Sequence, residues 1–345
     1  MINKEGRRGF SLLGVLVLLG ASSVYATEMD ECVACHVDFH HKSKTLHFDP
    51  AKACASCHEG VPQPQKHLKP HAIKVDLKAY LGVKLETETP RYDIERMTAG
   101  MQYPLYYETS RLGEDPNPMV TIPAGEFVMG TNNRLPDEGP EHKVTLPVFK
   151  IDIYEVTNLQ YRKFINETRR RSPKHFRNRT FPEGKADHPV TYVSWKDADA
   201  YCKWAEKRLP TDEEWEKAAR STDGRYFPWG NEFNANYANS PHRWGNLNLE
   251  GDTSPVGSFE KGKSEYGVYD MSGNVWEWTD SWYKAYPGNT HDTENYGEKY
   301  KTLKGGSWWD CSFYQCGISA PVYNRSFFLR STKNSSFGFR CAKDA

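Results

Sequence analysis

The pentapeptide Cys-x-x-Cys-His occurs twice near the start of the chain, as Cys32–His36 and, 22 residues later, as Cys54–His58. Two thiols at this spacing can form thioethers to both vinyl groups of one porphyrin, and the adjacent imidazole then reaches the iron from the proximal side. A zinc site or a pair of disulfides is the alternative use of such cysteines. We expect two c-type haems, attached through Cys32, Cys35, Cys54 and Cys57 and ligated at iron by His36 and His58.

Histidine is also the residue type available in this stretch as the distal ligand of each haem iron. Five further histidines are candidates: His40, His41, His47, His67 and His71. Histidine in place of methionine generally lowers the reduction potential of a haem, so we expect two low-potential, electron-transferring haems. A segment this short cannot bury a conventional core, and covalent haem supplies the missing stabilisation. We therefore expect a small, mostly helical or irregular dihaem cytochrome c domain at 27–84.

The first 26 residues have the pattern of an export signal. A basic start and an apolar stretch precede Val24-Tyr25-Ala26, which fits a cleavage site. The apolar stretch is shorter than the roughly 20 residues of a bilayer span. We expect a signal peptide at 1–26 and a periplasmic or otherwise exported protein, with an uncleaved signal anchor as the alternative and the sole membrane attachment. Adjacent Arg7 and Arg8 leave both the general secretory and the twin-arginine route open.

Two differently built regions share the chain. Seven of the twelve histidines lie between His36 and His71, whereas all ten tryptophans lie between Trp195 and Trp309. Between these regions the sequence has neither helical nor strand periodicity, which predicts a linker at 85–117 and a second domain at 118–345. Lysine plus arginine equals aspartate plus glutamate, at 45 each. This balance gives no overall electrostatic footprint for nucleic acid, so we expect no nucleic-acid partner.

Short extended runs and a few capped helices are predicted in the second domain. A strand, a turn and a second strand are expected over Val120–Gly130, and a further strand over Val144–Ile153. Helices are expected over Asn158–Asn166 behind Thr157, over Trp195–Lys207, and over Asp212–Arg220 behind a capping box of Thr211 and Glu214. The remainder is rich in Gly, Asn, Ser and Trp, which predicts a loop-dominated domain.

A series of motifs runs through the second domain. In order, they are Ile122–Gly130, Glu155–Asn158, His188–Val190, Lys207–Thr211, Pro228–Asn231, Gly273–Trp278, Gly305–Trp308 and Gly338–Arg340. By these motifs the domain resembles the formylglycine-generating enzyme (sulfatase-modifying factor) family over about 225 residues. The resemblance implies an α+β fold of the C-type-lectin-like kind, with little regular secondary structure.

The resemblance assigns roles to the four remaining cysteines. Cys202 and Cys341 match a disulfide pair of the family, a bond that an oxidising compartment permits. Cys311 and Cys316 match the Cys-x-x-x-x-Cys pair that binds copper(I), and soft thiolates suit that metal. Ser307 would be a catalytic pocket residue. A local disulfide is the alternative for Cys311 and Cys316, which lie one residue further from the Gly-Gly-Ser motif than the family pattern implies.

The resemblance also implies a structural calcium ion. The matching ligand positions are Asp270, Gly273, Val275 and Glu277. Two carboxylates and two backbone carbonyls would supply the oxygen ligands that calcium prefers. The alternative is a tight Gly-Asn turn packed under the neighbouring tryptophans. A second calcium site would involve Asn239, without assigned partners.

Two functions fit these features. In the family, copper held by the cysteine pair binds the cysteine of an unfolded sulfatase segment and activates dioxygen, and the cysteine becomes an aldehyde. The first hypothesis is an exported oxidoreductase of this type, acting on a sulfatase or another cysteine-containing peptide, whose haems exchange electrons with the copper site. The second is a non-catalytic electron-transfer protein that serves a redox partner protein and uses Trp308 and Trp309 to bind it. No catalytic-triad arrangement or phosphate-binding glycine loop supports a hydrolase.

Overall fold

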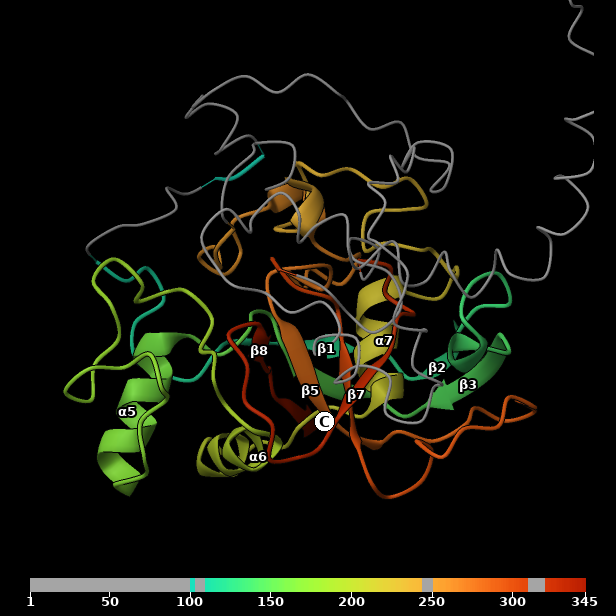
Figure 1. Ribbon diagram of the computed structural model, residues 1–345. Coiled ribbons are helices and arrows are strands. Elements are labelled where there is room, and N and C mark those ends of the chain that lie inside the picture. The colour runs from blue at the N-terminus through green and yellow to red at the C-terminus, as the bar shows by residue number, and fades with distance from the viewer. Residues whose placement is uncertain (1–99, 103–108, 244–250, 310–319) are drawn as a thin grey trace, which may run out of the picture. The chain divides into compact units, whose positions relative to one another are not determined.

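A computed structural model of the chain describes residues 100–102, 109–243, 251–309 and 320–345 (Figure 1). The predicted leader at 1–26, the predicted haem residues from Cys32 to His71, and the pair Cys311 and Cys316 lie outside the described residues. The chain divides into two compact units, 1–76 and 77–345, and every described residue belongs to the second. Within the described ranges, no helix has both the length and the apolar character needed to cross a membrane.

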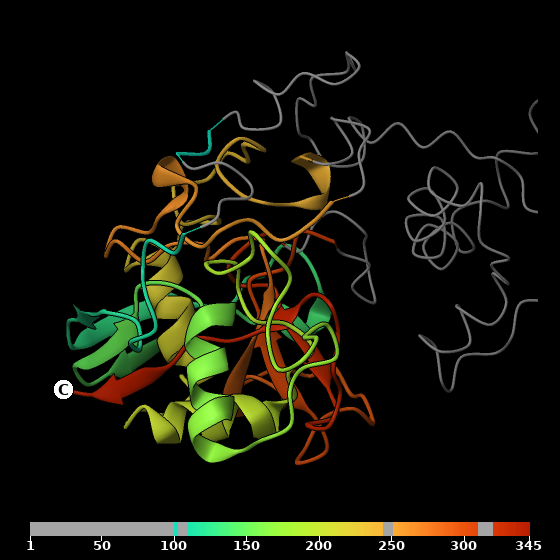
Figure 2. The same ribbon diagram turned by 90° about the vertical axis from the view of Figure 1, so that its left-hand side faces the viewer.

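A three-stranded antiparallel sheet joins the two ends of the described domain. Its strands, in spatial order, are β1 (Met119–Ile122), β4 (Phe149–Asp152) and β9 (Ala342–Asp344). Ile122 lies opposite Phe149, and Ile151 lies opposite Ala342; all four side chains are buried in one apolar cluster. Figure 2 shows β9, in red, running to the C-terminus beside the green strands. The last residues of the chain therefore complete the sheet that β1 begins.

The strand predicted over Val144–Ile153 is two strands in the structure. β3 (His142–Leu146) pairs with β2 (Gly125–Met129), whereas β4 pairs with β1, and Pro147 lies between β3 and β4. Proline has no amide hydrogen to continue a ladder, so the chain changes its partner strand there. The strand, turn and strand predicted over Val120–Gly130 are confirmed as β1 and β2.

A second, mixed sheet lies near the centre of the domain (Figure 1). Its strands, in spatial order, are β7 (Ser326–Phe328), β6 (Lys301–Lys304), β5 (Trp276–Trp282) and β8 (Phe337–Gly338). β5 is antiparallel to β6 and parallel to β8, with an irregular register between Trp278 and Trp282. Because Lys304 lies opposite Glu277, the turn that follows β6 lies beside the loop that precedes β5.

Each of the three α-helices in the described residues begins with a capping box. They are α5 (Asn158–Thr168), capped by Thr157; α6 (Trp195–Trp204), capped by Ser194; and α7 (Asp212–Arg220), capped by Thr211. All three predicted helices are confirmed, and the bounds of α7 are those predicted. α6 ends three residues earlier than predicted, since Glu206 has a left-handed backbone with φ 58°. Two short 3-10 helices, η1 (Pro136–Glu138) and η2 (Glu260–Gly262), lie in the connections.

Aromatic side chains and one disulfide hold the core together. Trp215 and Trp278 are fully buried, and the Trp278 indole donates a hydrogen bond to the Val193 carbonyl at 3.1 Å. A disulfide joins Cys202 in α6 to Cys341 just before β9, with Cα atoms 5.6 Å apart. The bond ties α6 to the C-terminal strand.

Candidate functional site

The turn after β6 carries the Gly-Gly-Ser motif and leads toward the cysteine pair. Gly305 has a φ of 94°, a left-handed conformation that favours glycine, and a Cβ there would lie 3.0 Å from the Trp215 ring. The Gly305 carbonyl accepts a hydrogen bond from Gly273 N at 2.7 Å. Trp308 N donates to the Asn274 carbonyl at 2.9 Å. The turn is therefore fixed against a tryptophan ring on one side and the loop before β5 on the other.

Asn274 organises the loop before β5. It is fully buried with a φ of 59°, a left-handed conformation that asparagine tolerates better than most residues. Its Nδ2 donates to Glu155 Oε2 at 2.7 Å, and its Oδ1 accepts from Ser254 N at 2.9 Å and Asn239 Nδ2 at 3.1 Å. One side chain therefore links three buried segments to the loop that holds Trp308.

Ser307, the predicted pocket residue, lies inside the turn. Its side chain is buried, and its hydroxyl donates a hydrogen bond to the Trp309 carbonyl. Trp308 and Trp309 follow it with both side chains partly exposed and their ring centroids 6.5 Å apart. The structure thus places Ser307 at the base of the turn and two indole rings at its surface.

Three buried carboxylates lie close to one guanidinium under the same loop. Arg340 holds Glu277 through two hydrogen bonds, from Nε to Oε2 at 2.6 Å and from Nη2 to Oε1 at 2.7 Å. Burial raises the pKa of Asp270 to about 6. Burial, together with the charges of Asp270 and Glu277, raises the pKa of Glu155 well above its usual range. The cluster therefore holds three buried carboxyl groups beside one guanidinium, and Glu155 and Asp270 keep their protons to a higher pH than ordinary carboxyl groups do.

Three carboxyl groups beside one guanidinium would fit a cation with oxygen ligands, whose charge would favour their ionised form. Three of the implied calcium ligands, Asp270, Gly273 and Val275, lie in the loop that enters β5, and the fourth, Glu277, is the second residue of β5. Glu277 Oε2 already accepts hydrogen bonds from both Arg340 and Trp215. No group of three or more His, Cys, Asp or Glu side chains that could hold a metal ion exists within the described residues, so the carbonyls of Gly273 and Val275 would have to complete the site.

A cavity of about 200 Å³ lies against Trp308, and its walls come from segments far apart in the sequence. They include Asn158 at the start of α5, His175 and Tyr192 in the loops between α5 and α6, Asp252, and Trp308. The volume is below the roughly 300 Å³ at which sites for drug-sized ligands begin. The cavity therefore suits one side chain or one small group.

His175 is part of the cavity wall and has one buried ring nitrogen without a hydrogen-bond partner in the described structure. Its Nε2 lies 3.0 Å from Asn158 Oδ1, while Asn158 Nδ2 donates to the Lys185 carbonyl at 3.0 Å. Because the amide oxygen accepts, Nε2 carries the hydrogen, and Nδ1 is an acceptor with no partner in the described structure. Burial and the Lys185 charge lower the pKa of His175 to about 4. The neutral ring can therefore accept a hydrogen bond.

Other polar groups in the wall complement that acceptor. Lys185 Nζ binds both carboxylate oxygens of Asp252, at 2.7 and 2.6 Å. The indole Nε1 of Trp308 is buried and has no acceptor among the residues that the structure describes. Two residues of the cavity wall thus each carry a buried, unpaired polar atom: an acceptor on His175 and a donor on Trp308.

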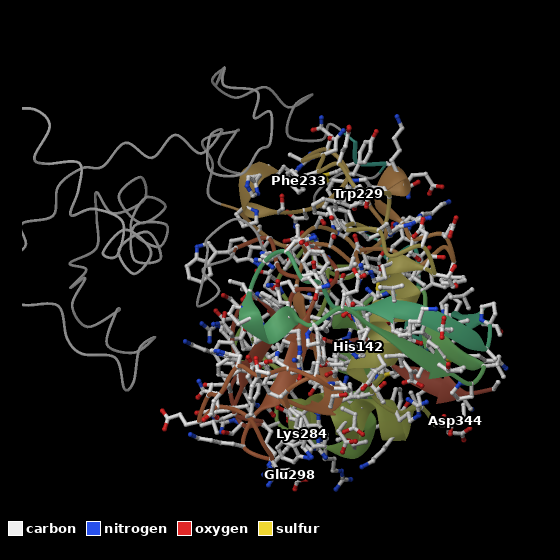
Figure 3. All side chains as sticks on the ribbon, turned by 90° about the vertical axis from the view of Figure 1, so that its right-hand side faces the viewer. His142, Trp229, Phe233, Lys284, Glu298 and Asp344 are labelled. Atoms are coloured by element: carbon white, nitrogen blue, oxygen red, sulfur yellow. A yellow bond between two sulfur atoms is a disulfide. The ribbon has the colours of Figure 1, made fainter. Side chains whose placement is uncertain are left out.

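A larger hollow of about 510 Å³ lies elsewhere in the domain. Tyr237 lines it and packs edge-on against Trp229, which Figure 3 labels close to Phe233. None of the described residues that line this hollow is a predicted site residue. The Trp308 cavity therefore remains the candidate functional site.

The structure brings Ser307 and the four implied calcium ligands to one turn and its supporting loop. The sequence analysis missed the cavity beside them, because His175, Lys185 and Asp252 lie in loops without a recognised motif. A signal was nevertheless present. The motif His188–Val190 contributes Pro189 to the wall, and the motif Gly305–Trp308 contributes Trp308.

Comparisons with known proteins match the second domain. A family model described as "Sulfatase-modifying factor enzyme 1-like domain" matches residues 108–345. The chain is 34% identical over 289 residues to the "Inactive C-alpha-formylglycine-generating enzyme 2" of Mus musculus, covering 68% of this chain and 89% of that protein. It is 33% identical over 287 residues to the "Formylglycine-generating enzyme" of Mus musculus, covering 66% of this chain and 75% of that protein.

A solved structure shows the same fold. The structure of PvdO from Pseudomonas aeruginosa superposes with a TM-score of 0.54 at 28% identity, covering 70% of this chain and 98% of that chain. The predicted fold with little regular secondary structure is thereby confirmed for the second domain. The similar proteins include one named as an enzyme and one named as inactive, at nearly equal identity.

Proposed function

The chain belongs to the family of sulfatase-modifying factor enzyme 1-like domains, and from that membership we propose an exported, copper-dependent oxidoreductase that converts a cysteine of a protein substrate to an aldehyde. Because relatives named as active and as inactive match equally well, the proposal depends on this chain's own residues. The observation that carries it is the fixed turn Gly305–Trp308, which contributes Trp308 to the cavity and precedes Cys311 and Cys316 in the sequence.

Cys311 and Cys316 are the proposed copper ligands. Thiolates are soft donors and suit copper(I). Copper bound there would supply the activation of dioxygen that oxidation of a thiol-bearing carbon requires. The contribution of the described residues is to position the reactants. Asn274 and Gly273 fix the turn that precedes the ligands in the sequence.

The Trp308 cavity is the proposed site for part of the substrate segment. His175 Nδ1 and Trp308 Nε1 are both buried, and a side-chain shift that exposed them would let a peptide group of the substrate donate to the first and accept from the second. The neutral state of His175 suits this role, because a protonated ring would offer a second donor in place of the acceptor. Binding there would hold the substrate next to the turn.

The proposed N-terminal haems and calcium ion complete the assignment. Oxidation of the thiol-bearing carbon to an aldehyde by one dioxygen releases the sulfur as hydrogen sulfide, forms one water, and consumes two external electrons and two protons. Haems attached through the two Cys-x-x-Cys-His motifs would supply the electrons from a redox partner protein. Calcium would favour the ionised form of the carboxyl groups under the turn. Export is supported by the disulfide between Cys202 and Cys341, a bond that persists in oxidising compartments.

The second candidate is a non-catalytic binding protein. It is favoured by the 34% identity to a relative named as inactive and by the partial exposure of Trp308 and Trp309 at the surface of the turn. In that case Cys311 and Cys316 would form a local disulfide, and the domain would bind a redox partner without oxidising it.

Product formation separates the two candidates. The exported, haem-loaded full chain is supplied with copper(I), dioxygen, a reductant and a cysteine-containing sulfatase-type peptide. The enzyme proposal expects loss of the peptide thiol and gain of an aldehyde that hydrazide labels, abolished by Cys311→Ala or Cys316→Ala and retained by Ser312→Ala in the same segment. Aldehyde formation in both cysteine variants would contradict it. Peptide binding without any aldehyde would support the second candidate.

Elemental analysis of the same preparation tests the other bound groups. Two haem irons are expected per chain, from the two motifs, and one should be lost when Cys54 and Cys57 are replaced by alanine. One calcium is expected, and Asp270→Asn should release it. Iron-free protein would exclude the haem assignment, and calcium-free wild-type protein would exclude the calcium assignment.

A further inference from the structure

The loop after α5 carries the densest run of positive charge in the described domain. Residues 169–179 contain six basic side chains: Arg169, Arg170, Arg171, Lys174, Arg177 and Arg179. No acidic residue lies between Glu167 and Glu183. The chain as a whole has zero formal charge, so this loop is a strong local exception. Such a concentration of one sign creates a potential that attracts oppositely charged partners.

The loop has a fixed shape. Phe176 is buried in the core, and Arg177 and Thr180 exchange two backbone hydrogen bonds of 2.7 and 2.8 Å. Asn178 and Arg179 in the turn between them both have left-handed backbones. The Arg179 guanidinium donates to the carbonyl of Arg170 at 3.1 Å and to the carbonyl of Ile165, so it caps the end of α5. One of the six cations therefore has a structural role.

The other five have no ion-pair partner within the described structure. Arg169, Arg171 and Arg177 are exposed. Arg170 lies over the Phe164 ring at 5.7 Å, and Lys174 lies over the Tyr192 ring at 5.7 Å. Elsewhere in the domain basic side chains are commonly paired; on α5 itself, for example, Arg162 binds Glu114 and Lys163 binds Asp115. The loop thus displays unneutralised positive charge on a rigid support.

This basic loop leads directly to the candidate site. His175, between Lys174 and Phe176, is part of the cavity wall, and so is Tyr192, over which Lys174 lies. Tyr192 has a φ of 55°, an unusual conformation for a bulky residue, held by a hydrogen bond from its amide to the Asn334 carbonyl at 2.8 Å. A ligand bound along the loop would therefore have its end at the cavity.

We infer that residues 169–177 are a docking surface for an acidic segment of a partner polypeptide, whose adjoining residues reach the Trp308 cavity. The loop matches carboxylates, which arginine binds in a two-point geometry, and the cavity of about 200 Å³ has room for one side chain of the adjoining residues. Docking at this surface is independent of the oxidation proposed above. Binding precedes any chemistry, so a non-catalytic domain could use the same surface.

Two other anionic partners fit the surface less well. A membrane would favour apolar side chains beside the charges, but the large exposed hydrophobic residues of the described domain are Val148, Tyr226 and Leu329, outside the loop. A single-stranded nucleic acid would favour free aromatic faces for base stacking. Phe176 and Phe181 beside the loop instead pack against each other, with ring centroids 5.9 Å apart.

The test measures binding without turnover, by fluorescence anisotropy with the full-length chain. The probe is a fluorescein-labelled peptide in which every second residue is glutamate, compared with the same peptide carrying lysine. The triple variant Arg169→Gln, Arg171→Gln and Arg177→Gln removes three exposed charges that make no described ion pair. The control variant Lys150→Gln, Lys299→Gln and Lys343→Gln removes the same charge from exposed positions elsewhere.

We expect the wild type and the control variant to bind the acidic peptide more tightly than the lysine peptide, and less tightly as salt rises. The loop variant should lose about tenfold in affinity, the effect of three exposed ion pairs of ordinary strength. Equal affinity of the two triple variants would overturn the inference. Tighter loop-dependent binding to a single-stranded oligonucleotide or to anionic phosphatidylglycerol vesicles would overturn it as well. Binding by a chain that forms no aldehyde would leave this inference standing while the oxidase proposal fails.

Discussion

At the scale of single residues, the turn beside the candidate site depends on a buried, hydrogen-bonded side chain held in an uncommon backbone conformation. The residue is Asn274, whose side chain links Glu155, Ser254 and Asn239 while its carbonyl holds Trp308. Its left-handed backbone would be strained for most other residues. The geometry of the turn therefore depends on Asn274. The motif Gly273–Trp278 contains this residue, but its hydrogen-bond partners become known only from the structure.

Replacing Asn274 by alanine should lower the free energy of unfolding by roughly 3 kcal/mol or more, since it leaves several buried polar partners unpaired at about 1–3 kcal/mol each. Asn178→Ala is the matched control, because Asn178 also has a left-handed backbone (φ 48°) but is exposed. Its cost should be about 1 kcal/mol, from backbone conformation alone. Urea unfolding followed by tryptophan fluorescence reports on the second domain, which contains all ten tryptophans. Equal losses in the two variants would contradict the role assigned to the Asn274 network.

Glu138 should give the domain a measurable pH dependence. It is fully buried, accepts hydrogen bonds from Arg134 and Asn324, and burial raises its pKa from 4.5 to about 7. The folded state therefore binds this proton more tightly than the unfolded chain does. Its contribution to stability is present below about pH 4.5 and is lost as the pH rises toward 7.

Glu138→Gln should flatten that dependence. Between about pH 4.5 and 7, the free energy of unfolding of the wild type should fall relative to that of the variant. The expected fall is about 1.4 kcal/mol for each unit by which the pKa of Glu138 in the folded state exceeds its pKa in the unfolded chain, a few kcal/mol in total. Urea unfolding at a series of pH values measures this, with Glu141→Gln as the control at an exposed neighbouring carboxyl. Parallel pH profiles for the wild type and Glu138→Gln would contradict the assignment.

At the scale of elements, local signals predict helices well and strand partners poorly. The capping residues Thr157 and Thr211 locate α5 and α7 from sequence alone, because the cap and its helix lie within a few residues. The break at Pro147 between β3 and β4 was missed, because both strands read as one extended run. The pairing of β5 with β8 joins segments about 60 residues apart, which no local pattern encodes.

The disulfide is the covalent link between elements, and its removal should be costly. Replacing both Cys202 and Cys341 by alanine opens a link across 139 residues. In the chain-entropy account, such a link contributes about 5 kcal/mol, and measured losses for native disulfides are roughly 2–5 kcal/mol. Thermal unfolding should show a lower midpoint for this double variant than for the control variant Cys311→Ala with Cys316→Ala. A double variant as stable as the wild type would contradict the structural role of the bond.

At the scale of the whole molecule, sequence motifs identify the family and the supporting loop, but the cavity requires the fold. Its wall combines Asn158, His175, Asp252 and Trp308, which only the three-dimensional arrangement brings together. The net charge of the chain is likewise not enough to predict which partners the folded surface attracts. The balance of 45 basic and 45 acidic residues argues against a uniformly charged surface, yet it conceals the basic loop at 169–179. Charge distribution on the folded surface, rather than its sum, indicates the acidic partner.

The central claim is that Cys311 and Cys316 together hold copper at the end of a fixed turn. The most direct test is a copper(I) titration of the reduced, full-length chain in competition with a chromogenic chelator, together with a thiol count before and after reduction. The account predicts one tightly bound copper(I) per chain, lost in either Cys311→Ala or Cys316→Ala and retained in Ser312→Ala. A wild-type chain that binds no copper(I), and whose Cys311–Cys316 disulfide persists in mild reductant, would contradict it.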